Sequence, residues 1–305
     1  RLDRCAAGRL LLVTPWHYRY RPKGEAITVA ECKAMNCVAQ ALCRTRDDWW
    51  KNAVPAGSPA GVPSSPHPVL DHYCASCDFV FNLAGVNRPQ NQEEFMQGNF
   101  GFASTLLDTL KAHGNRCPVM LSSSQQASLT GRFGNSEYGR SKKAGEDLFL
   151  AYERDFLQAQ PDTAQLSSPL SSSVKHPSGP STENRVGGET PRVLIYRFPN
   201  LFGKWCRPNY NSAVATFCNN IANDLPIQVN DASVELELLY IDDLVDEMVL
   251  ALSGKEHHCE FDGIDTLMQP DGRYCAVPVT HKVTLGRIVE LLHEFSKQPA
   301  TLIMP

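Results

Sequence analysis

From Asp78 onward the sequence alternates short apolar runs with longer amphipathic segments, and this alternation constrains the fold more than any other feature. Three runs have the length and apolar character of buried strands: residues 79–83, 118–121 and 193–197. Two segments between them space their apolar residues every three or four positions: residues 93–112 and 137–157. That spacing is typical of helices that pack on a sheet. Strands that alternate with helices predict an α/β fold with a parallel sheet covered on both faces.

Shorter elements follow Asn200. We expect a helix over residues 212–223, and then a strand at residues 234–238, where apolar and charged side chains alternate with period two. A further helix is expected from Tyr240 to about Leu252, and Thr284 could cap a last one. These elements predict a small α/β lobe.

Residues 158–190 have a different composition from both of their flanks. They are rich in serine and proline and have no periodic apolar face, so they cannot bury enough apolar surface to offset their ordering entropy. We interpret them as a disordered insertion between a helix and a strand, with a domain linker as the alternative. The predicted organisation is a first domain of residues 1–203 and a lobe of residues 204–305.

Charge and hydropathy restrict the partners. The formal net charge is -4, and the basic residues are scattered rather than gathered in a stripe, so nucleic acid is not an expected partner. No apolar run has the length that crosses a bilayer, and the first residues do not form a signal peptide. We therefore expect no membrane association and a cytoplasmic location. The chain begins with Arg1 and ends at Pro305, and we treat it as a possible fragment.

The eleven cysteines are odd in number and lie mostly in apolar surroundings, which favours reduced thiols packed as small hydrophobic residues. Cys74 and Cys77 have the spacing of half a zinc site, but no second pair accompanies them. His257, His258 and Cys259 are the other possible ligands, after what looks like an exposed loop. We predict no metal site.

Tyr138 and Lys142 indicate general acid–base chemistry. They are four residues apart and so share one helical face, where a nearby cation can lower the pKa of a phenol toward neutrality. Ser122, Ser123 and Ser124 come at the end of a predicted strand, the edge of a parallel sheet where ligands bind. Together they predict a group that donates a proton to a substrate oxygen. A solvated Tyr and Lys on an ordinary helix is the alternative.

These motifs resemble an extended short-chain dehydrogenase/reductase of the NAD-dependent epimerase/dehydratase family. Within it, FNLAGVNRP at residues 81–89, the serine run, and FPNLFGKWCRPNYN at residues 198–211 are similar to the reductase domain of capsular-polysaccharide enzymes. The resemblance covers roughly residues 78–157 and 191–305. It implies a Rossmann-like doubly wound sheet that binds NAD(P), a C-terminal substrate lobe, and reduction of a 4-keto UDP-N-acetyl-deoxyhexose with NADPH, NAD being possible. It also implies a possible homodimer through the helices at 93–112 and 137–157.

The resemblance also carries roles to individual positions. Tyr138 corresponds to the proton donor, Lys142 to the residue that lowers its pKa and holds the nicotinamide ribose, and Ser124 to the hydrogen-bonding serine. The expected cofactor contacts, besides Tyr138 and Lys142, are Leu83, Ala84, Gly85, Pro199 and Asn200. The expected substrate contacts are Asn87, Arg88, Lys204, Arg207 and Asn211.

Two departures from the family pattern stand out. Residues 10–13 could be a first strand, but bulky residues from Pro15 to Tyr18 follow where the family has a glycine-rich turn for the cofactor phosphates. Residues 1–77 are therefore atypical, and we expect the chain to bind NADPH weakly or not at all. The cupin domain that epimerises the sugar in the family is missing from this sequence. An epimerase or dehydratase of the same superfamily, or a catalytically silent binding protein, are the alternative functions.

Overall fold

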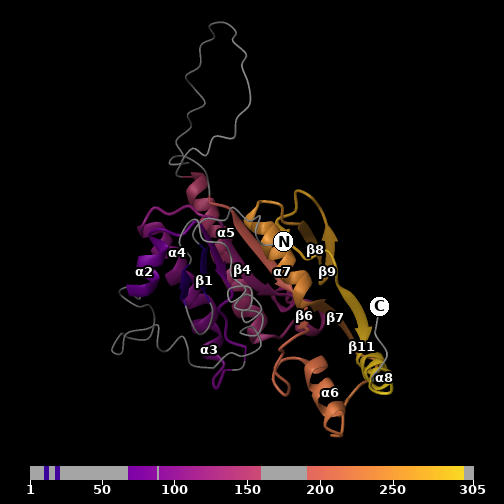
Figure 1. Cartoon of the computed structure of the whole chain (residues 1–305). Coiled ribbons are helices and arrows are strands. Elements are labelled where there is room, and N and C mark those ends of the chain that lie inside the picture. The colour runs from indigo at the N-terminus through magenta and orange to yellow at the C-terminus, as the bar shows by residue number, and fades with distance from the viewer. Residues whose placement is uncertain (1–9, 14–17, 21–67, 88, 159–190, 299–305) are drawn as a thin grey trace, which may run out of the picture.

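A computed structural model describes residues 10–13, 18–20, 68–87, 89–158 and 191–298 (Figure 1). Eight strands form one sheet in the order β2-β1-β3-β4-β5-β10-β8-β9. Their bounds are β1 Leu10–Val13, β2 Tyr18–Tyr20, β3 Phe79–Asn82, β4 Val119–Ser124, β5 Val193–Phe198, β8 His258–Asp262, β9 Asp265–Met268 and β10 Tyr274–Cys275.

The centre of this sheet is parallel. β1 pairs in parallel with β3, β3 with β4, β4 with β5, and β5 with β10. The outer strands β2, β8 and β9 pair antiparallel with their neighbours. The α/β fold and the Rossmann-like parallel sheet that the sequence predicts are therefore confirmed.

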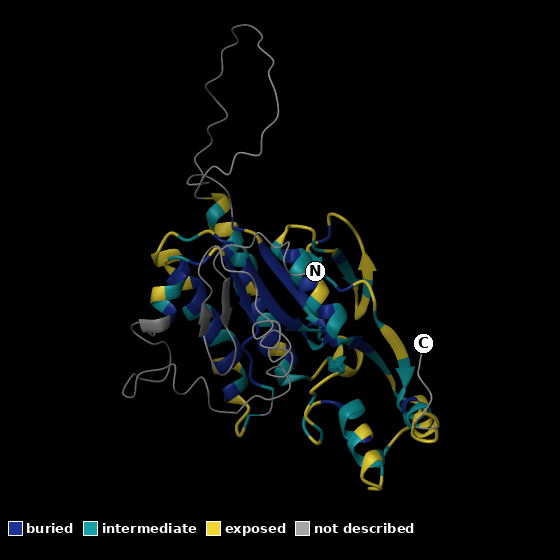
Figure 2. Cartoon of the chain, in the orientation of Figure 1, coloured by how far each residue is buried: buried dark blue, intermediate teal, exposed yellow. Residues whose placement is uncertain are grey.

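Helices cover the two faces of the sheet, because successive strand residues point in opposite directions. The helices on one face are α2 Pro68–Cys74, α4 Phe102–Ala112 and α5 Glu137–Gln158, and they pack on side chains such as Val119 and Ile195. On the other face α7 Ile241–Leu252 packs on Phe81, Met120 and Leu194. The strands β3, β4 and β5 between these helices are buried, and they are dark blue in Figure 2.

Two predicted helices differ in detail from the expectation. The helix at 93–112 is continuous but changes type, with α3 Glu93–Phe95, the π-helical turn η3 Met96–Gly101, and then α4. The helix that begins at Glu137 runs through Gln158, so Gln158 belongs to α5 and not to the predicted insertion. The rest of that insertion, residues 159–190, lies outside the described residues.

The C-terminal segment is divided between two sheets. β6 Asn200–Phe202, β7 Glu235–Tyr240 and β11 His281–Thr284 form a three-stranded sheet. α6 Ala213–Ala222 and α8 Leu285–Ser296, which Thr284 caps as predicted, contribute Phe217 and Ile288 to a third core beside it. By contrast β8, β9 and β10, which fall within the predicted lobe of residues 204–305, extend the large sheet instead. None of the helices in the described ranges is long and apolar enough to span a membrane.

At the amino-terminal edge, residues 10–13 form a strand beside β3, as the sequence suggested, although the family resemblance began only near Asp78. The next described element is β2, which runs antiparallel to β1. The family pattern would place a turn and a helix after this strand. Residues 14–17, which include Pro15 to His17, lie outside the described residues.

Seven cysteines lie in the described part of the chain, and all are free thiols. Five of them are buried, as predicted for small hydrophobic side chains: Cys74, Cys77, Cys117, Cys259 and Cys275. Cys218 is exposed, contrary to the expectation of apolar surroundings. Among the described residues, no group of three or more His, Cys, Asp or Glu side chains is placed to hold a metal ion.

Candidate active site

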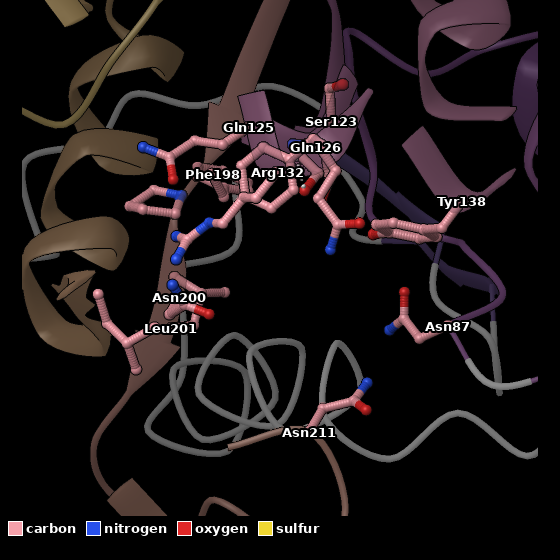
Figure 3. A pocket seen from close by; sticks show the side chains of 15 residues that line it. Asn87, Ser123, Gln125, Gln126, Arg132, Tyr138, Phe198, Asn200, Leu201 and Asn211 are labelled. Carbon is pink, nitrogen blue, oxygen red and sulfur yellow. Dashed lines mark hydrogen bonds between the residues drawn. The ribbon is translucent and has the colours of Figure 1, made fainter. Parts of the chain in front are cut away.

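A cavity of about 450 Å³ opens at the carboxyl ends of β4 and β5 (Figure 3). These strands end side by side, because Ser124 pairs with Phe198 across them. The lining residues are Asn87, Ser122, Ser123, Ser124, Gln125, Gln126, Arg132, Phe133, Tyr138, Phe198, Pro199, Asn200, Leu201, Asn211 and Leu236. The cavity therefore lies at the edge of the sheet where the sequence predicted the reacting hydroxyls.

Tyr138 stands in the first turn of α5 and lines this cavity. Its ring packs edge-on against Phe95 at 5.6 Å between centroids, which fixes the direction of the phenol. Burial raises the pKa of Tyr138, whereas a hydrogen bond with the Ser124 side chain lowers it. The structure thus places Ser124 and Tyr138 together in the lining of one cavity, and a protonated phenol faces that cavity at neutral pH.

Lys142 lies one turn further along α5 and is buried, with 5% of its surface exposed. Its Nζ donates a hydrogen bond to the Ser122 carbonyl at 3.0 Å and lies 5.7 Å from the Tyr138 ring centroid. Burial lowers the pKa of Lys142 to about 8, although the nearby Glu146 carboxylate opposes this shift. Tyr138 and Lys142 share one helical face, as predicted. Lys142 does not lower the pKa of the Tyr138 phenol as expected, because burial has the largest effect on that pKa and raises it.

Gly85 is the point where the loop after β3 approaches Lys142. A Cβ at this position would lie 2.8 Å from the Lys142 Nζ and 3.0 Å from the Asn99 Oδ1, so a larger residue would displace the ends of these two side chains. Asn99 holds the loop in place: its Oδ1 accepts from the Val86 N–H at 2.8 Å, and its Nδ2 donates to the Ser141 Oγ at 2.8 Å. This bridge comes from the π-helical turn η3, which re-aims one side chain toward α5. Sequence reasoning missed Asn99.

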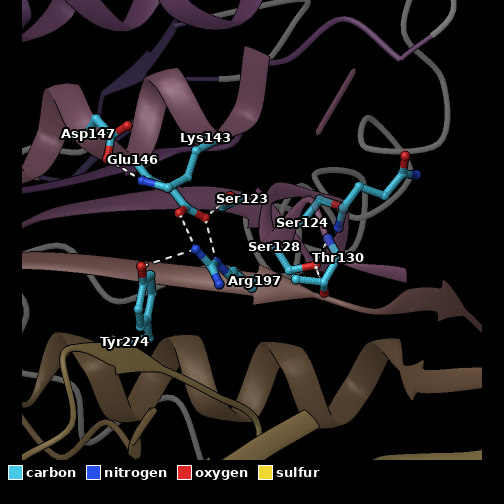
Figure 4. Close-up of polar contacts among 10 residues, drawn as sticks. Ser123, Ser124, Ser128, Thr130, Lys143, Glu146, Asp147, Arg197 and Tyr274 are labelled. Atoms are coloured by element: carbon cyan, nitrogen blue, oxygen red, sulfur yellow. Dashed lines mark hydrogen bonds and ion pairs between the residues drawn. The ribbon is translucent and has the colours of Figure 1, made fainter. Parts of the chain in front are cut away.

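A buried ion pair, also missed, lies behind the serine run (Figure 4). Glu146 is fully buried on α5 and accepts two hydrogen bonds from Arg197 of β5, at 2.9 Å and 2.7 Å. The Ser123 Oγ donates to the same carboxylate at 2.6 Å, and Arg197 also donates to the Tyr274 hydroxyl at 3.0 Å. The network ties α5, β4, β5 and β10 together directly beside Lys142. Glu146 follows Lys142 by four residues, a spacing that could have pointed to it.

The predicted cofactor contacts lie near one another but differ in exposure. Pro199 and Asn200 line the cavity. Leu83 and Ala84 are buried in the cores on the two faces of the sheet, so their side chains do not reach it. Gly85, Tyr138 and Lys142 meet as described above. This arrangement fits the nicotinamide end of a dinucleotide, and the region expected to hold its phosphates lies outside the described residues.

The predicted substrate contacts divide in the same way. Asn87 and Asn211 line the cavity. Lys204 does not, because its ammonium pairs with Asp242 at 2.5 Å, and Arg207 instead stacks its guanidinium 5.6 Å over the Tyr210 ring. Arg88 lies outside the described residues. Gln125, Gln126 and Arg132 also line the cavity, although no sequence pattern pointed to them.

The chain is similar to two proteins about twice its matched length. It is 35% identical over 233 residues to UDP-2-acetamido-2,6-beta-L-arabino-hexul-4-ose reductase of Pseudomonas aeruginosa, covering 76% of this chain and 49% of that protein. It also resembles the structure of the capsular polysaccharide assembling protein CapF from Staphylococcus aureus, with 35% identity, a TM-score of 0.53, and coverage of 77% of this chain and 50% of that one. The chain thus spans about half the length of these two relatives.

The fold is shared more widely. UDP-glucuronic acid 4-epimerase from Bacillus cereus, solved in complex with NAD, is 17% identical with a TM-score of 0.52, covering 76% of this chain and 64% of that chain. The NAD dependent epimerase/dehydratase family itself matches residues 66–260. This match and the 35% identity to the reductase confirm the resemblance drawn from the motifs. The chain belongs to the NAD dependent epimerase/dehydratase family.

Proposed function

We propose that this chain reduces the 4-keto group of a UDP-linked N-acetyl-deoxyhexose, with NADPH as the electron donor, in the synthesis of a surface polysaccharide. The observation that carries the proposal is the placement of Ser124 and Tyr138 in the wall of one cavity, backed by the buried Lys142. The reductase relative at 35% identity supports the choice of reaction. A cytoplasmic location and a homodimer through α4 and α5 belong to the same proposal.

The chemistry follows from the described side chains. The bound cofactor would supply the hydride. Tyr138 would donate its proton to the carbonyl oxygen of the sugar as negative charge develops there, and Ser124 would donate a hydrogen bond to the same oxygen or to the phenolate. Lys142 would donate hydrogen bonds to the nicotinamide ribose, the other role that the family resemblance gives it. Pro199, Asn200 and the backbone at Gly85 would lie against the nicotinamide.

The lining of the cavity supports reduction over dehydration. Loss of water from a sugar needs a second acid and base beside the redox pair, and a carboxylate usually supplies it. The lining residues of the described cavity include five amide side chains but no Asp or Glu: Asn87, Gln125, Gln126, Asn200 and Asn211. Reduction needs only one proton donor, which Tyr138 provides. An epimerase would use the same pair of Tyr138 and Lys142, so analysis of the products is needed to distinguish epimerisation from reduction.

One observation favours a binding protein without activity. The strand β2 runs antiparallel to β1 where the family pattern has a helix whose amino terminus receives the cofactor phosphates. Weak binding of NADPH therefore remains our prediction. Isothermal titration of the chain with NADPH measures it, and undetectable binding together with no turnover would favour the silent alternative.

The test of the proposed function is turnover of a 4-keto UDP-N-acetyl-deoxyhexose by the purified chain. We expect NADPH to be consumed in a one-to-one ratio with the keto sugar and the product to be a hydroxyl sugar with two more hydrogens. An isomerised or dehydrated sugar formed without net NADPH consumption would point to the epimerase or dehydratase alternative.

A further inference from the structure

The cavity has an unequal distribution of charge along its wall. Among its described lining residues Arg132 carries the only formal charge, and the others are amides, hydroxyls or apolar side chains. A neutral, hydroxyl-rich sugar suits the amides, which both donate and accept hydrogen bonds. A single cation at one place in such a wall marks where an anionic part of a ligand would be most stabilised.

Arg132 is presented by a short structured turn. It lies in the 3-10 helix η5 Gly131–Phe133, which is closed by hydrogen bonds from the Phe133 N–H to the Thr130 carbonyl at 3.0 Å and from the Gly134 N–H to the Gly131 carbonyl at 3.2 Å. Gly131 has a φ of 53°, a left-handed conformation that glycine adopts at little cost. The backbone therefore holds Arg132 at the edge of the cavity.

The Arg132 guanidinium makes two contacts, which use only some of its N–H donors. Its Nη1 donates to the Glu235 carbonyl at 3.1 Å, and its Cζ lies 4.9 Å over the Phe133 ring. No carboxylate of the described residues pairs with it. A guanidinium has five N–H donors, so the remaining ones can bind two oxygens of one anion in a bidentate manner.

Two of the cations that the sequence suggested, Lys204 and Arg207, are engaged elsewhere. Lys204 is paired with Asp242, and Arg207 is stacked on Tyr210 outside the cavity wall. If Lys204 bound a ligand anion instead, it would lose part of its attraction to Asp242. Arg132, in the turn before α5, is therefore a better candidate for binding an anion than Lys204 or Arg207.

We propose that Arg132 binds the diphosphate of the nucleotide sugar, an inference that rests on the proposed function. Figure 3 shows the Arg132 side chain across the cavity from Tyr138. In a hexose the carbon that bears the diphosphate lies across the ring from C4. A sugar whose C4 faces Tyr138 therefore directs its diphosphate toward the Arg132 side. The fixed fork of arginine matches two phosphate oxygens, which makes the contact specific as well as attractive.

The test compares UDP with uridine, because the two ligands differ only in the diphosphate. Isothermal titration is carried out on the full chain and on Arg132→Gln, Arg132→Lys, Lys204→Gln and Arg207→Gln. Arg140→Gln is the matched control, since Arg140 is an exposed arginine of α5 that pairs with Glu137 and does not line the cavity.

We expect Arg132→Gln to weaken UDP binding on the order of 10- to 100-fold, the usual effect of losing hydrogen bonds between charged groups. Uridine affinity should not change. Arg132→Lys should restore part of the loss, because lysine keeps the charge but not the fork. The two variants at 204 and 207 and the Arg140 control should bind UDP as the unaltered chain does. Circular dichroism of Arg132→Gln should be unchanged, because the side chain is exposed.

Three results would overturn the inference: equal UDP affinity in Arg132→Gln, equal losses for UDP and uridine, or no UDP binding by the unaltered chain. A larger loss in Lys204→Gln or Arg207→Gln than in Arg132→Gln would also do so. The outcome is separable from that of the proposed function. UDP binding that depends on Arg132 without turnover of the keto sugar contradicts only the proposed reaction, whereas turnover and UDP binding that survive Arg132→Gln contradict only this inference.

Discussion

Replacing Arg197 by methionine should destabilise the protein severely, because it leaves the Glu146 carboxylate buried without its cation. Both side chains lie almost entirely out of solvent, at 8% and 0% exposure, so water cannot compensate for the lost guanidinium. Two charge-assisted hydrogen bonds to Glu146 and one to Tyr274 disappear together. Breaking a buried pair in this way costs about 3–5 kcal/mol. That is a large part of the roughly 5–15 kcal/mol by which a domain is stable.

Urea unfolding followed by circular dichroism measures this loss. The matched control is Arg287→Met on α8, because Arg287 pairs with Glu290 and Glu294 but is 48% exposed. Exposed pairs contribute about 0–1 kcal/mol, so the control should stay within that range of the unaltered chain.

A double variant tests the cause. Glu146→Leu combined with Arg197→Met removes both charges, and apolar replacement of a buried pair is often neutral. Ser123 and Tyr274 lose a partner, at about 1–3 kcal/mol for a buried group left unsatisfied. We therefore expect the double variant to be more stable than Arg197→Met alone. A loss below about 1 kcal/mol in Arg197→Met, or a double variant as unstable as the sum of its two single variants, would refute the reasoning.

Three further predictions concern the site and the segment before β5. Tyr138→Phe should lower kcat on the order of 100- to 10,000-fold with an unchanged fold, since it removes one proton donor. Tyr73→Phe on α2 is the control, and an undiminished kcat in the Tyr138 variant would contradict the role. Burial lowers the pKa of Lys142 from 10.5 to about 8, so the unfolded chain binds more protons between these values and stability should rise with pH across that window by about 3 kcal/mol through this group. Lys142→Met should lose this rise in unfolding free energy, and an identical pH profile would count against a buried ammonium. Excising residues 160–188 should leave the thermal midpoint nearly unchanged, because loop closure changes by about 0.6 kcal/mol per doubling of length. A large fall would mean that the segment packs on the body.

The sequence predicted the parts of the fold that local patterns encode. Buried parallel strands are continuous apolar runs, so β3, β4 and β5 could be located to within a few residues. β10 could not, because it contains only Tyr274 and Cys275 and exists through its pairing with β5. A strand of two residues is too short to show a periodic pattern. That β8, β9 and β10 join the large sheet depends on contacts between segments far apart in the sequence.

The site shows the same division. Tyr138 and Lys142 could be found because their spacing on one helix is itself the geometry, and Ser124 because it ends a strand. The pairing of Lys204 with Asp242 joins residues 38 positions apart, so the charge of Lys204 was visible in the sequence and its partner was not. Arg132 lies in a three-residue 3-10 turn, which is too short for a sequence pattern to indicate where its side chain points.

The measurement that tests the central claim most directly is transfer of label to the sugar. The purified chain is incubated with a 4-keto UDP-N-acetyl-deoxyhexose and saturating NADPH that carries deuterium on the transferable position of the nicotinamide, and the product is examined by mass spectrometry and NMR. The account predicts one deuterium per product molecule at the sugar's C4, and loss of that product in Tyr138→Phe. An unlabelled sugar product, or deuterium at C4 that forms as readily in Tyr138→Phe, would contradict it.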